Sequence, residues 1–261
     1  MNRTALVLAA HGSRHEPDVN DRVRGFARML SAHRWFDEVA VAFHQGEPGF
    51  SRILDRLSAD EIVVVPVMTS EGYYSDVVLP RELARNARYA TIRVRRTGPV
   101  GTHPGMATLV ARRFRKILLD HELHASDTTL ALIGHGTRRH ARSRHATWEL
   151  ARKLRQHELC AQVVAAFLDD DPQVESILET ATHPNLIVIP FLIGDGPHAA
   201  RDIPRRLGFI PSDDVSLPLA GRIRHRYVVC DSAVGMDPGI VEVIAELART
   251  PGGPVLQEAA P

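Results

Sequence analysis

Short apolar runs alternate with amphipathic segments along most of the chain. In the first half the predicted strands are residues 4–10, 39–43, 62–68 and 91–96. Segments with helical spacing of apolar residues follow the strands, and the clearest of them, residues 18–33, places Val23, Phe26 and Leu30 on one face. Strands that alternate with helices predict parallel sheets covered by helices on both faces. The predicted fold class is therefore α/β.

The second half of the chain repeats the pattern of the first. His11 and His135 are 124 residues apart, as are Pro80 and Pro204. The predicted second-half strands are residues 130–133, 163–167, 186–193 and 226–230. The predicted second-half helices are residues 142–157, 172–182, 202–207 and 238–249. A period this long indicates two tandem homologous domains rather than a solenoid, whose repeats are far shorter.

The repeat sets the expected domain boundaries. We predict a first repeat at residues 1–124, a second at residues 125–250 and a mobile tail at residues 251–261. Gly101 and Gly235 are 134 residues apart, so the second repeat carries an insertion, which we place at residues 205–216. In the first repeat, helices are expected to begin near Pro48, Pro80 and Pro104.

Composition narrows the classes of function. The formal net charge of +1 on 261 residues argues against general nucleic-acid binding. No apolar run is long enough to span a bilayer, and no signal peptide is recognised, so we expect a cytoplasmic protein that binds no membrane. Cys160 and Cys230 match no metal or disulfide spacing. Only two of the 32 basic residues are lysines, and the arginines suit carboxylate or phosphate ligands.

Candidate metal ligands follow three predicted strands of the second half. His135 follows the first strand, Asp169 begins an acidic run after the second, and His198 follows the third. The carboxyl ends of parallel strands meet at one edge of a sheet, where open α/β folds bind ligands. Two imidazoles and a carboxylate suit zinc, cobalt, nickel or ferrous iron.

The matching loops of the first half are less well equipped with metal ligands. That half retains His11 but has Gln45 and Tyr74 where the second half has Asp169 and His198. His44, His103 and His183 are interpreted as incidental. The acidic run at residues 169–171 has a second interpretation, a polar turn that caps the helix at Pro172.

Several motifs give the chain a resemblance to a known family. They are Gly134-His135-Gly136-Thr137-Arg138, Ala166-Phe167-Leu168-Asp169 with Pro172, Pro190-Phe191-Leu192, Gly196-Pro197-His198 with Asp202-Ile203-Pro204, and Gly235-Met236-Asp237-Pro238. With the two α/β repeats, they resemble the class II tetrapyrrole chelatases, and most of all the sirohydrochlorin cobaltochelatases of the CbiX type. The resemblance covers nearly the whole chain. Asp169 stands where the family usually carries a glutamate, and Val78 replaces the acid of Asp-Ile-Pro in the first repeat.

The resemblance implies insertion of a divalent metal into sirohydrochlorin or a related tetrapyrrole without ATP or any other nucleotide. Cobalt is the first expectation, with iron or nickel as alternatives. By motif, His135 and His198 correspond to the family's metal-handling histidines, and we expect them to be catalytic as well. Asp169 is the expected third metal ligand. From its position in the first repeat, His11 is a further candidate catalytic residue. Arg14 and Arg138, with Arg139 and Arg201, are expected to bind substrate carboxylates. Tyr73 and Tyr74 are either core aromatics or a surface on which the macrocycle stacks, and Tyr74 is the candidate for this contact.

Two other functions stay open on the sequence. The first is a non-catalytic relative that binds metal or tetrapyrrole, suggested by the degenerate first repeat. The second is a dinucleotide-dependent oxidoreductase, because residues 194–199 match Gly-x-Gly-x-x-Ala. Pro197 lacks the N–H that a phosphate would need, and the motif follows the third strand instead of the first. We expect a monomer or a small homo-oligomer.

Overall fold

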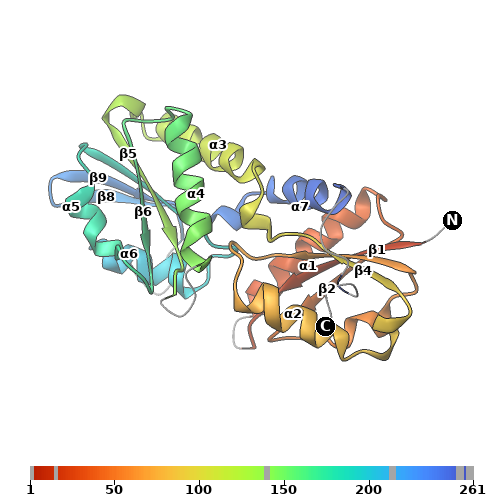
Figure 1. Ribbon diagram of the computed structural model, residues 1–261. Helices are drawn as coiled ribbons and strands as arrows, with labels where there is room; N and C mark the ends of the chain where they lie inside the picture. The colour runs from red at the N-terminus through yellow and green to blue at the C-terminus, as the bar shows by residue number, and fades with distance from the viewer. Residues whose placement is uncertain (1–2, 15–16, 138–141, 212–215, 251–255, 257–261) are drawn as a thin grey trace. The chain divides into compact units, whose positions relative to one another are not determined.

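The chain forms two compact α/β units, each built around its own sheet. The computed structural model describes residues 3–14, 17–137, 142–211, 216–250 and 256 (Figure 1). Unit 1 contains residues 1–103 and 239–261, and unit 2 contains residues 104–238. Two sheets built mainly of parallel strands confirm the predicted α/β fold class, with one antiparallel edge strand in the second sheet.

Unit 1 has a four-stranded parallel sheet in the order β2-β1-β3-β4. Its strands are β1 (Thr4–Ala10), β2 (Glu38–Phe43), β3 (Glu61–Pro66) and β4 (Arg93–Arg96). Helices α1 (Pro17–Ala32) and α7 (Ile240–Arg249) pack against each other and against this sheet. The opposite face is covered by η1 (Ile53–Arg56), α2 (Leu79–Ala84) and η3 (Ala87–Ala90). The helices thus bury both faces of the central strands β1 and β3, which are continuously apolar.

Unit 2 has five strands in the order β6-β5-β7-β9-β8. They are β5 (Thr128–Gly134), β6 (Gln162–Phe167), β7 (Asn185–Pro190), β8 (Leu219–Ile223) and β9 (Arg226–Cys230). Helices α3 (Gly105–Asp120) and α4 (Arg142–Gln156) pack together over the sheet. The other face carries η6 (Val174–Ser176), α5 (Ile177–Thr180) and α6 (Ile203–Arg206) (Figure 1).

The last helix of each sequence repeat belongs to the unit built by the other repeat. Helix α3 ends the first repeat but packs in unit 2, on β7 and α4. Helix α7 ends the second repeat but packs in unit 1, on β3 and α1. The compact units therefore differ from the repeats expected at residues 1–124 and 125–250. The amphipathic pattern of a helix identifies its buried face but not the sheet that it covers.

Two predicted helices begin later than their prolines. After β2 the chain forms only the 3-10 turn η1, and after β6 only η6 and α5. The reason is a backbone bridge at the end of each strand, Phe43 with Gly49 and Phe167 with Gln173. The Pro48 and Pro172 carbonyls accept the N–H groups of Phe43 and Phe167, each at 2.9 Å. Pro48 and Pro172 are therefore held beside the strand ends in place of starting helices.

The insertion of the second repeat contributes a strand that the apolar pattern did not reveal. Strand β8 pairs with β9 in antiparallel orientation, with Leu219 opposite Cys230 and Ile223 opposite Arg226. It lies just beyond the range 205–216 that we assigned to the insertion, of which residues 212–215 are outside the described part of the chain. As an edge strand β8 is half-buried only at alternate residues, so it lacks the continuous apolar run of central strands such as β3 and β7.

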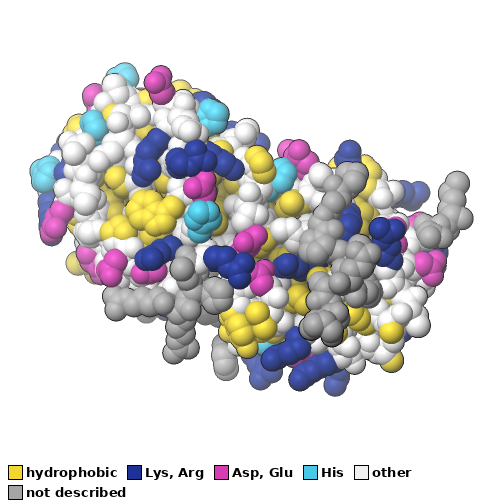
Figure 2. Space-filling view, in the orientation of Figure 1, with side chains coloured by type: hydrophobic (Ala, Val, Ile, Leu, Met, Phe, Trp, Pro, Cys, Tyr) yellow, Lys and Arg dark blue, Asp and Glu magenta, His cyan; other side chains and the backbone are white. Residues whose placement is uncertain are grey.

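The structure also bears on the expected absence of membrane spans, on the distribution of charge and on the expected mobile tail. Within the described residues no helix is long and apolar enough to cross a membrane. Acidic and basic side chains are mingled on the face drawn in Figure 2. Leu256 is buried in the core of unit 1, so at this position the chain differs from the expected mobile tail. The remaining residues of 251–261 are outside the described part of the chain.

Candidate functional site

The candidate site lies at the carboxyl edge of the sheet in unit 2. Strand β5 lies between β6 and β7, and the chain continues from β5 to β6 on one side but from β7 toward β8 and β9 on the other, so the connections leave β5 and β7 in opposite directions. The carboxyl edge at such a reversal is the usual ligand position in open α/β sheets. His135 directly follows β5, and its carbonyl accepts the N–H groups of Leu168 and Asp169 at 3.1 and 3.0 Å. The loops after β5 and β6 are therefore fixed to each other.

Gly136 allows the chain to turn away immediately after His135. Its φ of +67° lies in the left-handed region, which side chains disfavour. A Cβ atom there would lie 2.8 Å from the Cβ of Asp170 and 2.9 Å from that of Phe167. Gly12 repeats this conformation after His11, with a φ of +70°. The glycine that follows each histidine is thus required by both backbone conformation and space.

His198 approaches His135 from the loop after β7. It begins a π-helical turn, His198–Asp202, that leads directly into α6. The two imidazole centroids lie 5.3 Å apart with an interplanar angle of 87°. Nitrogens bound about 2.0–2.1 Å from one tetrahedral metal place ring centroids roughly 5 Å apart. The spacing therefore suits two histidines that share one metal ion.

Hydrogen bonds determine which nitrogen each histidine presents. Nδ1 of His135 donates to the Gly136 carbonyl at 2.9 Å, because a carbonyl can only accept. Nδ1 of His198 lies 2.7 Å from Oδ2 of Asp202, where it donates to the carboxylate. In the neutral rings the lone pair is then on Nε2 of both residues. This arrangement, with a carbonyl or carboxylate behind Nδ1, is usual for metal-binding histidines.

The three carboxylates of the acidic run have different surroundings. Oδ2 of Asp169 lies 3.5 Å from Nδ1 of His135, and its side chain is 61% exposed. The Asp170 side chain is buried, lies near Arg144 of α4, and accepts the N–H of Asp171 at 2.8 Å. Asp170 thus stabilises a polar turn, but no helix begins at Pro172, so the helix cap expected from the last residue of the run is wrong. Asp169 remains near the histidine pair, on the Nδ1 side of His135.

A complete metal-binding cluster is not formed by these side chains. Among the described residues, no three His, Cys, Asp or Glu side chains are grouped to hold a metal ion. Asp169 as third ligand therefore stays a prediction, and the two imidazoles are the assembled part of the site. Such a pair offers a metal two protein ligands and leaves its other positions for further ligands.

Unit 1 places a different set of rings at the equivalent edge. His11 follows β1 and lies edge-on to Tyr74, with ring centroids 4.5 Å apart. His44 is 5.4 Å from His11 and 5.0 Å from Tyr74. Tyr74 begins the π-helical turn Tyr74–Val78, the counterpart of His198–Asp202. Tyr74 is 40% exposed, which leaves part of its ring available for stacking on a flat ligand.

The arginines expected to bind carboxylates are only partly described. Arg14 is exposed in unit 1, three residues after His11. Arg201 is half-buried in the π-helical turn that begins at His198. Arg138 and Arg139 lie outside the described residues, and so their predicted role stays a prediction.

The contacts of two residues in these loops were not predicted from the sequence. Asp202 was treated only as part of a motif, although its i,i+4 spacing from His198 was a signal for contact. His44 was considered incidental, although it directly follows β2 and so lies at the same sheet edge as His11. Its ring contacts with His11 and Tyr74 make it part of the unit 1 ring set.

Comparisons with known proteins identify the family of the chain and the fold that it shares. The chain matches the CbiX family over residues 5–117 and 129–250. It is 31% identical over 271 aligned positions to a protein of Halobacterium salinarum named "probable sirohydrochlorin cobaltochelatase", covering 96% of this chain and 92% of the relative.

Solved structures share the fold. A multi-domain protein of Deinococcus radiodurans, described as structurally similar to chelatases, superposes with a TM-score of 0.78 at 25% identity. That match covers 98% of this chain, which spans only 57% of the larger protein. The sirohydrochlorin chelatase SirB of Bacillus subtilis subspecies spizizenii, in complex with cobalt, gives a TM-score of 0.70 at 20% identity, covering 95% and 94% of the two chains. The family match and the sequence identity together show that this chain belongs to the CbiX family of sirohydrochlorin chelatases.

Proposed function

We propose that this protein inserts a divalent metal, cobalt in the first place, into sirohydrochlorin without ATP. The observation that carries the proposal is the pair His135 and His198, whose rings are 5.3 Å apart and whose Nδ1 atoms are both hydrogen-bonded. Both Nε2 atoms are thereby suited to bind one metal ion. The name of the Halobacterium relative supports cobalt, and iron and nickel are the alternatives.

The reaction exchanges a metal ion for two protons. The metal forms bonds to the pyrrole nitrogens, its bonds to the imidazoles break, and two pyrrole N–H protons leave. A histidine that has released the metal has a free lone pair on Nε2, so it can accept one of these protons. Asp202 would stabilise the resulting His198 imidazolium through its contact with Nδ1. Asp169, 3.5 Å from His135, would do the same for the second ring.

Two protein ligands favour transfer of the metal over storage. A site that encloses a metal with four protein ligands holds it firmly, whereas an open site leaves positions for incoming ligands. The described part of the chain holds no three-residue cluster, so the pyrrole nitrogens would complete the coordination. Arg201, in the turn that begins at His198, is proposed to bind a carboxylate of the macrocycle, and the same role stays a prediction for Arg14 and Arg138. Guanidinium groups pair well with carboxylates.

The same observation favours one other function, metal or tetrapyrrole binding without insertion. Two imidazoles alone would bind a metal weakly, as expected of a carrier that retains part of an ancestral site. Binding without conversion separates this function from a chelatase.

The test is an anaerobic absorbance assay of sirohydrochlorin with cobalt, ferrous iron or nickel. We expect enzyme-dependent spectral conversion with cobalt that is lost in His135→Ala, whereas Glu149→Ala, which removes an exposed carboxylate of α4, keeps the wild-type rate. Conversion with iron or nickel but not with cobalt would show that the inserted metal is not cobalt. Binding of metal or tetrapyrrole with no acceleration would identify a carrier. Neither binding nor conversion would refute both functions.

A further inference from the structure

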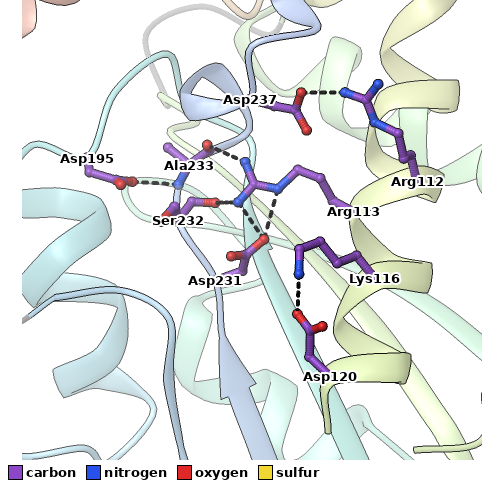
Figure 3. A network of polar contacts seen from close by, with 9 residues as sticks. All are labelled: Arg112, Arg113, Lys116, Asp120, Asp195, Asp231, Ser232, Ala233 and Asp237. Atoms are coloured by element: carbon purple, nitrogen blue, oxygen red, sulfur yellow. Dashed lines mark hydrogen bonds and ion pairs between the residues drawn. The ribbon is translucent and has the colours of Figure 1, made fainter.

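One arginine of α3 binds the segment that follows β9. Nε and Nη2 of Arg113 donate to Oδ2 of Asp231 at 2.9 and 2.5 Å. The remaining N–H groups reach the carbonyls of Ala233 at 2.9 Å and Ser232 at 3.0 Å (Figure 3). The Arg113 and Asp231 side chains are only 12% and 9% exposed. A buried fork with this many acceptors holds its partners in one geometry.

We call residues 231–235 the β9 loop; it in turn holds the segment that leads to His198. The N–H of Ala233 donates to Oδ1 of Asp195 at 2.5 Å, so Ala233 binds Arg113 through its carbonyl and Asp195 through its amide (Figure 3). The N–H of Gly235 donates to the Leu192 carbonyl at 2.9 Å. A Cβ on Gly235 would lie 2.1 Å from the Ile193 carbonyl, so the two backbones are in direct contact.

The Arg113–Asp231 ion pair of this network is replaced by uncharged residues at the corresponding positions of the other repeat. The glycine contact is repeated in unit 1, where a Cβ on Gly101 would lie 2.1 Å from the Thr69 carbonyl. In unit 1 Val64 pairs with Arg96, and in unit 2 the equivalent Val188 pairs with Cys230. The next residues along the chain, Thr97 and Asp231, are therefore counterparts. At the spacing of 134 residues Arg113 corresponds to Leu247, and at the spacing of 124 residues Asp195 corresponds to Glu71. The arginine fork is thus present in the unit that has the His135–His198 pair.

We propose that Arg113 is a positioning residue for His198. It holds the β9 loop, which binds Asp195, and His198 follows Asp195 by three residues. The spacing of His198 from His135 therefore depends on a side chain from the first sequence repeat, through the exchange of α3. This inference rests on the proposed function of the histidine pair, and it makes the second-repeat site dependent on the first repeat.

A double-mutant cycle with His198→Ala distinguishes a positioning role of Arg113 from a purely structural role. Removing the arginine leaves Asp231 buried and unpaired, which lowers stability by itself. If Arg113 acts through His198, its loss should weaken cobalt binding only while His198 is present. If it merely supports the fold, the loss should be the same in either background.

The experiment measures cobalt affinity without tetrapyrrole, and kcat and KM with it, for folded full-length variants. We expect Arg113→Ala to weaken cobalt binding and lower kcat about tenfold, as for outer-sphere partners of metal-binding histidines, with KM for sirohydrochlorin unchanged. The double variant with His198→Ala should bind cobalt no more weakly than His198→Ala alone. Lys116→Ala, which breaks only a surface pair with Asp120 on the same helix, is the matched control and should equal wild type.

If Arg113→Ala does not fold, substitutions of Asp195 test the same connection between the β9 loop and His198. Asp195→Ala removes the acceptor of the Ala233 N–H and should reproduce the loss, whereas Asp195→Asn keeps an acceptor and should retain activity. Wild-type cobalt affinity and kcat in Arg113→Ala or Asp195→Ala would overturn the inference, as would equal losses in both His198 backgrounds. Unchanged cobalt binding and turnover in His198→Ala would instead refute the proposed function.

Discussion

The Nδ1 atom of His198 lies 2.7 Å from Oδ2 of Asp202, four residues further along the chain. The π-helical turn His198–Asp202 brings both side chains to the same surface and ends where α6 begins. Val78 stands at the equivalent position of unit 1, where Tyr74 replaces the histidine. The imidazole and its carboxylate partner are thus present together in one unit and replaced together in the other.

This pairing predicts the effect of removing the carboxylate. Asp202→Ala should reduce metal affinity or turnover about 10–100-fold, the usual effect of losing a partner that orients a metal-binding histidine. Asp202→Asn retains an acceptor for Nδ1 without the charge, so its loss should be smaller. Cobalt titration and the insertion assay measure both. Turnover of Asp202→Ala equal to wild type would show that the contact does not serve the reaction.

Gly136 predicts a backbone requirement beside His135. Gly136→Ala should lower the free energy of unfolding by at least about 1–2 kcal/mol, because alanine is disfavoured at a φ of +67°. The crowded Cβ adds to this loss. Gly25→Ala is the matched control: in the interior of α1 its Cβ meets only the end of Arg28, at 3.8 Å, so stability should rise by roughly 0.5–1 kcal/mol. Urea unfolding measures both, and equal stabilities would contradict the conformational argument.

Cys230 should be chemically inert in the native protein. Its side chain is fully buried, and burial raises the pKa of the thiol above its ordinary value of 9.0, with Asp231 and Asp195 adding to the rise. Little thiolate is therefore present at neutral pH. Alkylation at pH 8, followed by mass spectrometry, should modify Cys230 only after unfolding. Rapid modification of the native chain would show that the thiol is reachable.

Asp195 predicts a dependence of stability on pH. Burial raises its pKa above 3.8, although the Ala233 N–H, Ser232 and Arg113 act in the opposite direction. The folded state then holds this proton more tightly than the unfolded state, so stability falls as the pH rises from about 3.8 through the raised pKa.

Asp195→Asn does not ionise and should escape this loss. Relative to wild type, the variant should therefore be more stable above that pH window than below it. Urea unfolding of both proteins on either side of the window measures the difference. A stability difference that stays constant with pH would contradict the assignment.

Strands buried on both faces were predictable because their apolar runs are continuous. Strand β5, expected at residues 130–133, extends over Thr128–Gly134. Strand β8 escaped prediction because only alternate residues are sheltered in an edge strand that contains Arg222. The exchange of α3 and α7 was equally hidden, since each helix has the same apolar face whichever sheet it covers.

The site could be predicted as far as strand ends determine it. His135 and His198 were expected together because the carboxyl ends of β5 and β7 meet at one edge, and their rings lie 5.3 Å apart. Side-chain hydrogen bonds are not determined by strand order, so the Asp202 contact and the Arg113 network became visible only in the structure. The same holds for His44, whose partners come from two other loops.

The most direct test of the account compares cobalt insertion into sirohydrochlorin by wild type, His198→Ala and His11→Ala under anaerobic conditions. We predict that His198→Ala abolishes insertion while the protein stays folded, and that His11→Ala has the smaller effect. Unchanged turnover in His198→Ala would show that insertion does not take place at the His135–His198 pair of unit 2. Equal loss in both variants would contradict a site that depends mainly on the second repeat.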